Sequence, residues 1–349
     1  MNFWQKLKKE KVALGTTRRK GGVEPLMVLA PMADVTDPAM RRVIAKYGKP
    51  DVMWTEFVSA DGLFLGGYEH LIKDLAFTEA ERPIVAQFFT SRPDMMKKAA
   101  ELACDLGFDG VDINMGCPDK SVEKQGGGAA LIKNPKLAQE IIFSAMEGAK
   151  KDGKNLPVSI KTRIGYNKNE LETWLPALLE THPAVITIHA RTRKEMSLVP
   201  ARWEHVARAV EIRNDYFNNL QKNIPEDERT LIFGNGDVFN IDDAKAKAKE
   251  SGADGVMLGR AIFGNPFLFS KEVSRTVLDI PTRLRVLVEH TKLFSELLPH
   301  KSFAIMKKHF KAYVTGFDGA KELRMKLMEA ESADKVGEII EDYIKNGLK

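Results

Sequence analysis

GVDINMGCPDKSVEKQGGGAALI, residues 110–132, begins with a short apolar run and ends in a glycine-rich loop. The run at 110–115 has the length and the β-branched content of a buried strand. Helical periodicity lies on both sides of it, because apolar residues recur at three- and four-residue steps within 93–106 and 135–149. A strand that alternates with helices in this way predicts a parallel sheet.

Further runs of the same kind occur along the chain, at 27–32, 51–58, 84–89, 157–164, 185–191, 230–235 and 255–261. Helix-length segments separate them, and eight such units are the number that closes a barrel. After about residue 280 the strand pattern stops and the sequence becomes rich in Leu, Lys, Glu and Met. The sequence therefore predicts an α/β fold, a TIM (β/α)8 barrel followed by a small C-terminal helical bundle.

Polar and glycine-rich sequence follows seven of the eight predicted strands. The clusters are Met32-Ala33-Asp34, Gln87, Asn114 to Gly128, Lys161 to Arg163, His189 to Arg193, Asn235 to Asp237, and Gly259-Arg260. Barrel enzymes build their active sites at the carboxyl ends of the strands. We therefore expect these clusters to meet at one rim and to form an active site.

The bulk composition excludes several classes of protein. Hydrophobic residues make up 44% and charged residues 29% of the chain, which is typical of a globular protein with a sizeable core. The apolar runs are too short for a membrane span, and the N-terminus lacks the apolar segment of a secretory signal. The two cysteines, Cys104 and Cys117, form no CxxC or Cys/His cluster, so we expect no disulfide, no metal and a cytoplasmic location. No assembly element is evident, and we expect a monomer.

Basic residues concentrate towards the two ends of the chain. Residues 1–20 contain seven Lys/Arg against one acid, and residues 283–326 contain ten against four. The run at 301–311, with Lys307 and Lys308, contains no acid and favours a polyanion partner, although a solvated helix face has the same pattern. We divide the chain into a basic lead-in at 1–22, a catalytic barrel at 23–280 and a helical domain at 281–349.

Two loops late in the predicted barrel have the composition of a phosphate site. The last two strands end in FGNGDV and LGRAIFGNP, where glycines allow backbone N–H groups to approach a phosphate closely. Arg260 can add a charge-assisted hydrogen bond. Two ordinary turns would look similar, but this fold commonly binds phosphate after strands seven and eight.

Two side chains at the same rim are candidates for chemistry. Alternation in SIKTRIG points Lys161 into the barrel mouth, where a cation would stabilise a reduced, anionic flavin, although a rim lysine often only snorkels to solvent. Cys117 lies on the glycine-flanked loop, and a thiol with an ordinary pKa of about 8.5 is protonated at neutral pH and can act as a general acid. Cys104 lies among small apolar residues at helical spacing and is predicted to be a core residue.

These segments together resemble the tRNA-dihydrouridine synthase family of bacterial type. The motifs are APMADVTDPAMRR, INMGCP with its GGGAALI loop, KTRIG, TIHARTR, NGD and GADGVMLGRA, in that order across roughly residues 26–270, and the MKKHF segment resembles the family's C-terminal domain. The resemblance implies reduction of the C5–C6 double bond of particular uridines in tRNA, with FMN as cofactor and NADPH or NADH as reductant.

The resemblance also implies a role for each matched residue. Cys117 is the proton donor, Asn114 contacts uracil, and Arg191 and Arg193 meet the substrate nucleotide and its phosphates. Lys307 and Lys308 lie on the tail expected to bind tRNA. The implied cofactor contacts are Pro31, Met32, Ala33, Gln87, Lys161, His189, Asn235, Gly236, Asp237, Gly259 and Arg260.

Two alternatives and two departures accompany this interpretation. One alternative is a dihydroorotate- or dihydropyrimidine-type flavin dehydrogenase that acts on a free pyrimidine, which has no need for the basic tail. The other is a non-catalytic RNA-binding protein on a relic barrel. The presence of Cys117 and Lys161 counts against it, because RNA binding alone does not need them. Asp34 stands where the family more often has glycine, and the segment 202–229 is long, with no evident function.

Overall fold

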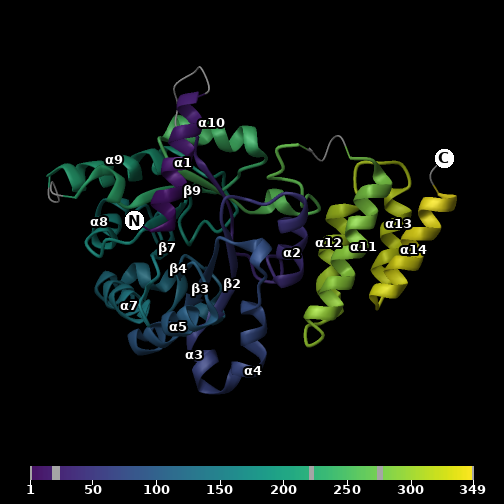
Figure 1. Cartoon of the computed structure of the whole chain (residues 1–349), viewed down its shortest axis with the longest axis horizontal. Helices are drawn as coiled ribbons and strands as arrows, with labels where there is room; N and C mark the ends of the chain where they lie inside the picture. Colours follow the sequence, from purple (N-terminus) through teal and green to yellow (C-terminus); the bar gives the residue numbers. More distant parts are fainter. Residues whose placement is uncertain (1, 18–23, 220–223, 273–277, 348–349) are drawn as a thin grey trace.

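The computed structural model describes residues 2–17, 24–219, 224–272 and 278–347. Its main sheet contains eight parallel strands in the order β1-β10-β9-β8-β7-β4-β3-β2 (Figure 1). They are β1 (Leu26–Leu29), β2 (Met53–Ser59), β3 (Ile84–Phe89), β4 (Gly110–Met115), β7 (Val158–Arg163), β8 (Val185–His189), β9 (Leu231–Asn235) and β10 (Gly255–Leu258). A parallel bridge between Val28 and Val52 joins β1 to β2 and closes the barrel. The predicted TIM barrel is confirmed, and each predicted run overlaps one strand.

Helices cover the outside of the barrel and bury their apolar faces against the strands. They include α2 (Pro38–Tyr47), α5 (Pro93–Leu106), α7 (Pro135–Gly148), α8 (Leu171–Leu179), α9 (Glu204–Asn219) and α10 (Ile241–Ser251). Helix α5 begins at Pro93, whose ring suits the first helical position, and ends at Gly107, which takes a left-handed φ of 80°. The predicted segment 202–229 contains α9 and a 3₁₀ turn, η5 (Glu226–Glu228), while residues 220–223 lie outside the described ranges.

The basic lead-in forms α1 (Phe3–Thr17), which closes the amino-terminal end of the barrel. Trp4 is 1% exposed, and its ring lies 5.5 Å from that of Trp54 and 5.6 Å from that of Phe233 in the barrel interior. Lys8 pairs with Asp254, which precedes β10, at 2.7 Å. Residues 18–22 of the predicted lead-in lie outside the described ranges. Apolar side chains therefore fill this end, and the polar ones gather at the opposite end.

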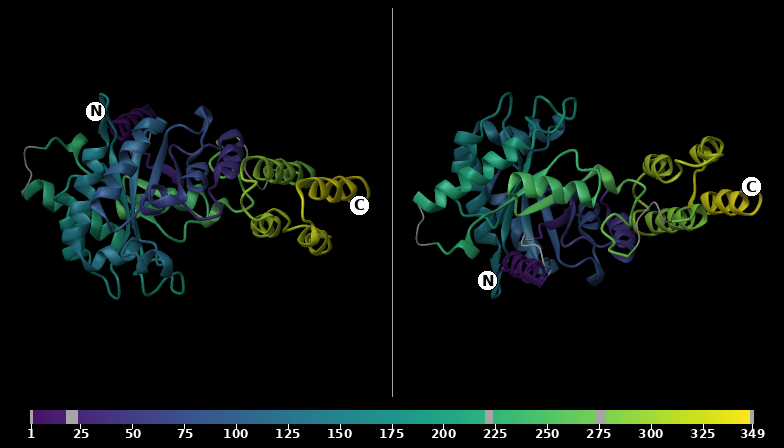
Figure 2. Two further views of the ribbon diagram at one scale, coloured as in Figure 1. Left: turned by 90° about the horizontal axis from the view of Figure 1, so that it is seen from below. Right: turned by 90° about the horizontal axis from the view of Figure 1, so that it is seen from above.

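The described residues 278–347 form a helical bundle on one side of the barrel (Figures 1 and 2). Its elements are α11 (Ile280–Leu297), the 3₁₀ turn η7 (Phe303–Ile305), α12 (Met306–Tyr313), α13 (Ala320–Glu329) and α14 (Ala333–Asn346). The bundle has its own apolar core, which includes Leu287, Phe310 and Val336 and continues into Val43 of α2. Helix α2 is thus the part of the barrel on which the bundle packs.

Two parts of the barrel were not predicted. The connection from β2 to β3 forms four short turns, α3 (Ala60–Gly62), a π-helical η1 (Leu63–Gly67), α4 (Tyr68–Leu71) and η2 (Ile72–Leu75), followed by η3 (Glu79–Glu81). After α7 a small hairpin forms from β5 (Lys150–Lys151) and β6 (Lys154–Asn155). Within the described ranges, no helix combines the length and the apolar character needed to cross a membrane.

Candidate active site

A buried polar network lies in the barrel interior below the mouth. Asp112 on β4 accepts hydrogen bonds from Ser159 Oγ at 2.5 Å and from Gln87 Nε2 at 2.6 Å, and all three residues are fully buried. Burial raises the pKa of Asp112 to about 6, although Ser159, Gln87 and Lys161 each lower it. Gln87 was expected to reach a cofactor, and it lies inside this network, with its side-chain amide nitrogen and oxygen both bonded to protein.

Asn114 connects the network to the loop that carries Cys117. Its Nδ2 donates to Gln87 Oε1 at 3.0 Å, and its Oδ1 accepts from the backbone N–H groups of Gly116 at 3.1 Å and Cys117 at 2.9 Å. Only one orientation of the Asn114 amide satisfies both sides. The backbone at Cys117 is therefore fixed, through Asn114 and Gln87, by the carboxylate of Asp112.

The loop after β4 holds the Cys117 thiol half-buried at the mouth. It continues into α6 (Lys120–Lys124) and the 3₁₀ turn η4 (Gly128–Lys133). Gly128 has a φ of +58°, and a Cβ added there would lie 2.7 Å from the carbonyl oxygen of Cys117. Glycine is therefore required at this position for the loop to close on itself.

Burial raises the pKa of the Cys117 thiol, and the neighbouring cations Lys161 and Arg163 offset this only in part. The thiol is consequently protonated at neutral pH. Cys104 differs in its surroundings: it is buried in α5, and its Sγ lies 3.4 Å from the carbonyl oxygen of Ala149. The structure thus separates the two cysteines as the sequence predicted, one in the core and one at the mouth.

Lys161 on β7 is paired in register with Asn114 on β4 and with Thr187 on β8, so these residues share one layer of the barrel. Burial lowers the pKa of Lys161 to about 8, with a further lowering by Arg163 and an opposing effect of Asp112. Among the described residues, the Thr187 hydroxyl is buried without a hydrogen-bond partner. A cationic amine and an unsatisfied hydroxyl in one layer are suited to a polar group bound from outside.

Arg163, two residues beyond Lys161, ties two loops of the rim together. Its Nε donates to the carbonyl oxygen of Gly116 at 2.7 Å, and its Nη1 donates to those of Thr192 at 3.0 Å and Met196 at 3.2 Å. Burial lowers its pKa to about 10, so the guanidinium stays charged at neutral pH. The Cys117 loop and the loop after β8 are therefore held in one arrangement.

His189 and Arg191 form a second pair at the rim. Arg191 is only 2% exposed, and it donates to the carbonyl oxygen of Val199 at 2.6 Å, to Asp237, and towards His189 Nε2 at 3.2 Å. Burial, followed by Arg163 and other cations, holds the pKa of His189 well below its usual range. A neutral His189 that accepts from Arg191 through Nε2 carries its proton on Nδ1. Arg191 was expected to meet substrate phosphates; here its guanidinium is buried and bonded to protein acceptors.

Arg193 is also engaged by the protein. Its Nε lies 2.8 and 3.0 Å from the two carboxylate oxygens of Glu123 on α6, and its guanidinium lies 5.4 Å from the ring of Tyr166. Its side chain keeps 23% of its surface exposed, so it remains accessible at the edge of the mouth. Arg193 therefore joins the Cys117 loop to the loop after β8 from the outer side.

The residues expected to hold a phosphate lie where β9 and β10 end. Gly236 has a φ of 120°, and a Cβ added there would lie 2.8 Å from Ala201 and 3.1 Å from the His189 ring. The Asp237 carboxylate accepts hydrogen bonds from Arg191 and Arg260. A carboxylate does not donate to phosphate, so Asp237 can bind one only through its backbone N–H. Arg260 has a 65% exposed side chain.

The remaining predicted residues lie around the same mouth. Asn235 is buried, and its Nδ2 donates to the carbonyl oxygen of Met257 at 2.8 Å. A Cβ added at Gly259 would lie 3.4 Å from Met32 Sδ, which places the end of β10 against the end of β1. Next to Met32, Pro31 is buried and Ala33 is exposed. In the part of the chain that the structure describes, no group of three or more His, Cys, Asp or Glu side chains is arranged to hold a metal.

The structure separates the residues of the basic run in the tail. Lys308 is exposed and Lys307 is half-buried on α12, whereas His309 is fully buried. Lys301 is directed at barrel carboxylates, with its Nζ 3.0 Å from Glu56 and 2.9 Å from Asp74. The basic face predicted from charge alone is therefore smaller than the run from 301 to 311.

A family model described as dihydrouridine synthase (Dus) matches residues 28–347. The chain belongs to the dihydrouridine synthase family. The "Probable tRNA-dihydrouridine synthase 2" of Bacillus subtilis (strain 168) is 37% identical over 353 residues, which cover 99% of this chain and 98% of the relative. The "Probable tRNA-dihydrouridine synthase" of Staphylococcus aureus (strain COL) is 35% identical over 350 residues, which cover 98% and 95%. The resemblance found in the motifs is therefore confirmed.

Among solved structures, a histamine dehydrogenase from Rhizobium sp. 4-9 superposes with a TM-score of 0.51 at 11% identity, over 76% of this chain and 48% of that chain. At this level of identity the likeness concerns the barrel fold alone.

Sequence reasoning gave no individual role to three residues of this dihydrouridine synthase site, Asp112, Arg163 and Glu123, although the last two lie within the predicted rim clusters. The first two carried a usable signal, because Asp112 is two residues before Asn114 and Arg163 is two residues after Lys161 on the same strands. Strand periodicity places such residues on the same face. Glu123 had no comparable signal, since its pairing with Arg193 depends on how two distant loops fold.

Proposed function

We propose that this protein reduces the C5–C6 double bond of particular uridines in tRNA, with FMN as cofactor and NAD(P)H as reductant. Family membership and full-length relatives named as tRNA-dihydrouridine synthases support the reaction class. The observation that carries the proposal is the Cys117 thiol, kept neutral at the barrel mouth in the company of Lys161 and Arg163. A neutral thiol in this position is a proton donor, which the reduction of a carbon–carbon double bond requires.

The residues at the mouth fit FMN. A buried amine with a lowered pKa (Lys161) and an unsatisfied buried hydroxyl (Thr187) offer donors to the polar edge of a flavin ring. The half-buried Gly259 and the exposed Arg260 next to it suit a phosphate at the end of β10. When bound, FMN supplies the hydride that adds to C6 of uracil, after it has been reduced by NAD(P)H.

We assign the cofactor contacts by position around the mouth. Lys161 and the Nδ1–H of His189 hold the ring, and the buried Asn235 supports the wall between them and the phosphate. Arg260 and the backbone around Gly236 and Asp237 hold the phosphate. The strand end with Pro31, Met32 and Ala33 lines the site from β1. Gln87, inside the barrel, sets the wall below the ring.

We assign to Cys117 the transfer of its thiol proton to C5 of uracil. The thiolate that remains lies near two cations, Lys161 and Arg163, which lower the pKa of the thiol and stabilise its charge. Asn114 fixes the donor through the backbone of Cys117 and has one amide N–H left to offer to a uracil carbonyl. Since the base must lie inside the mouth, the uridine has to leave its stack.

The helical tail supplies the RNA contacts in this proposal. Lys308 and the half-buried Lys307 present charge to phosphates, as RNA recognition by shape requires. At the edge of the mouth, Arg193 is partly accessible, and a substrate phosphate can share it with Glu123. Arg191 acts indirectly, by orienting His189 and Asp237.

Titration of the apo-protein with FMN, followed by anaerobic addition of NADPH and then tRNA, tests the proposal. We expect tight non-covalent binding, bleaching of the flavin by NADPH, and reoxidation by tRNA but not by free uridine or dihydroorotate. Arg260→Ala should raise the Kd for FMN about 10- to 100-fold, the usual effect of a lost charge-assisted bond of about 1.5–3 kcal/mol. Arg208→Ala, which removes a similarly surface-exposed arginine paired with Glu172 and Glu211, is the control. A protein that does not bind FMN would refute the proposal.

A further inference from the structure

Asp34 lies in the turn that follows β1, within reach of Lys301 in the helical tail. Its φ of 54° is in the left-handed region, which favours glycine. Its backbone N–H donates to Glu56 Oε1 on β2. A residue other than glycine with a left-handed φ is strained, so we look for a contact of the Asp34 loop that stabilises this conformation. The loop is also close to the cofactor wall, because Met32 lies two residues before Asp34.

The contact that explains this loop comes from the tail. Lys301, between α11 and η7, extends into a group of carboxylates from three barrel segments, the β1 loop, β2 and η2. Its Nζ lies 3.0 Å from Glu56 Oε2, 2.9 Å from Asp74 Oδ1 and 3.9 Å from Asp34 Oδ1. The side chains of Lys301 and Glu56 are only 14% and 6% exposed. Burial lowers the pKa of Lys301, but Glu56 and Asp74 more than offset it, so the lysine is firmly charged.

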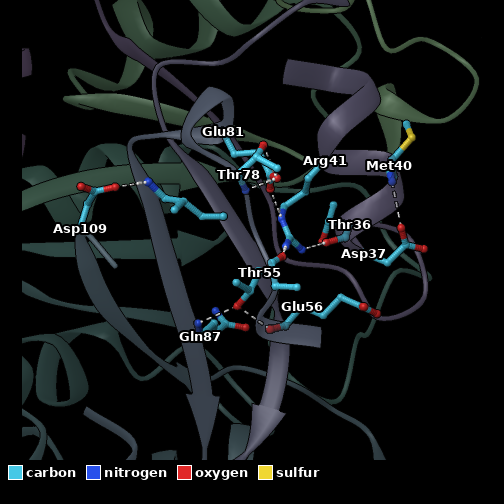
Figure 3. A network of polar contacts seen from close by, with 12 residues as sticks. Thr36, Asp37, Met40, Arg41, Thr55, Glu56, Thr78, Glu81, Gln87 and Asp109 are labelled. Atoms are coloured by element: carbon cyan, nitrogen blue, oxygen red, sulfur yellow. Dashed lines mark hydrogen bonds and ion pairs between the residues drawn. The ribbon is translucent and has the colours of Figure 1, made fainter. Parts of the chain in front are cut away.

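The barrel side of this contact is rigid. Arg41 is fully buried, and it donates to Glu81 Oε2 at 2.8 Å and to the carbonyl oxygen of Thr36 at 2.7 Å (Figure 3). Thr36 Oγ1 in turn accepts from the backbone of Met32 at 2.9 Å. Figure 3 also shows Asp37 close to Thr36 and Glu56 close to Thr55. We therefore expect the carboxylates that face Lys301 to stay in one place.

A second tail–barrel contact is more exposed and lies elsewhere. Glu289 of α11 accepts from Lys46 at 2.8 Å and from the Tyr47 hydroxyl at 2.6 Å, at the end of α2. The side chains of Lys46 and Glu289 are 58% and 30% exposed. Exposed pairs of this kind constrain geometry weakly, because water and salt compete for both charges. Of these two polar contacts, the one through Lys301 is better suited to fix the orientation of the tail.

We propose that Lys301 fixes the angle of the helical tail on the barrel mouth and thereby determines which uridine of a bound RNA reaches Cys117. The inference rests on the proposed function, since it concerns how the RNA substrate is presented. Lys301 is a positioning residue in this scheme. It does not contact RNA in this scheme, because its amine is enclosed by Asp34, Glu56 and Asp74.

The test compares Lys301→Met with Lys308→Met in the full-length, FMN-loaded protein. Lys301→Met should leave flavin reduction by NADPH unchanged and slow reoxidation by tRNA about 10- to 100-fold, as expected for a misplaced reacting group. Fragment mass spectrometry of tRNA should show dihydrouridine spread to other positions. The slope of log K for tRNA against log salt should stay as in the wild type. Lys308→Met should lower that slope by roughly 0.7–0.9 and leave the reduced position unchanged.

The fold should tolerate the loss of Lys301. Burial already raises the pKa of Glu56 to about 7, and loss of the lysine raises it further, so Glu56 takes up a proton instead of remaining an unpaired buried charge. Lys301→Arg should restore the wild-type position of reduction, and Glu56→Gln should cause a smaller change in the same direction as Lys301→Met. Spin-label distances between α8 and α14 should broaden in Lys301→Met.

Two outcomes would overturn the inference. Wild-type rate and position in Lys301→Met would show that the contact does not orient the tail. A salt slope lowered as in Lys308→Met would show that Lys301 binds phosphate directly. If the wild-type protein itself did not reduce tRNA, the proposed function would fail first, and that result is visible before any variant is made.

Discussion

The barrel mouth and the helical tail are both rich in basic residues, but their cations have different surroundings. At the mouth, Arg163 and Arg191 are almost fully buried, and each guanidinium is bonded to carbonyl oxygens of neighbouring loops. In the tail, Lys308 and Lys311 are exposed on α12. Buried cations position groups and shift pKa values, whereas exposed cations attract a polyanion from solution. Substitutions at the mouth should therefore change rates, and substitutions in the tail should change salt-dependent binding.

The largest effect should come from Cys117→Ala, which removes the proposed proton donor. The variant should keep FMN and accept hydride from NADPH at a near-normal rate, because Cys117 has no part in either step. Reoxidation by tRNA should slow by about 10²–10⁴, the usual contribution of a positioned general acid. Stopped-flow absorbance of the flavin measures both half-reactions. Cys104→Ala is the matched control, and wild-type reoxidation in Cys117→Ala would identify water or another group as the acid.

A smaller effect is expected for Gln87→Met, which interrupts the network between Asp112 and Asn114. The Asn114 amide loses its acceptor at 3.0 Å, so the backbone at Cys117 is less well fixed. We expect tRNA-dependent reoxidation to slow about 10- to 100-fold, with flavin reduction by NADPH little changed. Equal losses in both half-reactions would instead show that Gln87 acts mainly on the cofactor.

The two half-reactions should also differ in their dependence on pH. Lys161 has a pKa of about 8 and loses its charge above that value, so flavin retention and reduction should fall there by about tenfold per pH unit. Burial raises the pKa of Cys117, so the thiol stays protonated, and able to donate, to a pH above its ordinary value of about 8.5. Reoxidation by tRNA should therefore show a second decline at higher pH. Lys161→Met should abolish only the first decline, and a single inflection common to both reactions would argue against these assignments.

The smallest effect is expected in the tail, from Lys307→Ala combined with Lys308→Ala. Each phosphate contact that is lost should reduce the slope of log K against log salt by roughly 0.7–0.9, while flavin reduction stays normal. Filter binding of tRNA over a range of salt concentrations gives the slope. An unchanged slope would mean that α12 presents only a solvated face.

The sequence predicted the fold more completely than the site. The strands alternate with helices regularly enough that Pro93–Leu106 was located to the residue, because proline and glycine mark its ends. Nothing in TIHARTR indicates that the guanidinium of Arg191 is buried and bonded to Val199 and Asp237. The sequence indicated that Lys301 is part of a basic surface. Its partner Glu56 is 245 residues away along the chain, so no local pattern could show that the two are paired. Local pattern determines elements, but the burial of a charge depends on contacts between distant segments.

The most direct test is to supply the purified, FMN-loaded protein with NADPH and an unmodified tRNA transcript, and to measure dihydrouridine by nucleoside mass spectrometry. We predict dihydrouridine at a small number of discrete positions, dependent on NADPH and nearly abolished by Cys117→Ala. Free uridine at the same concentration should remain unreduced, because it lacks the contacts that the tail provides. A protein that binds FMN and is reduced by NADPH but forms no dihydrouridine in tRNA, or that reduces the free pyrimidine faster, would contradict the proposed function.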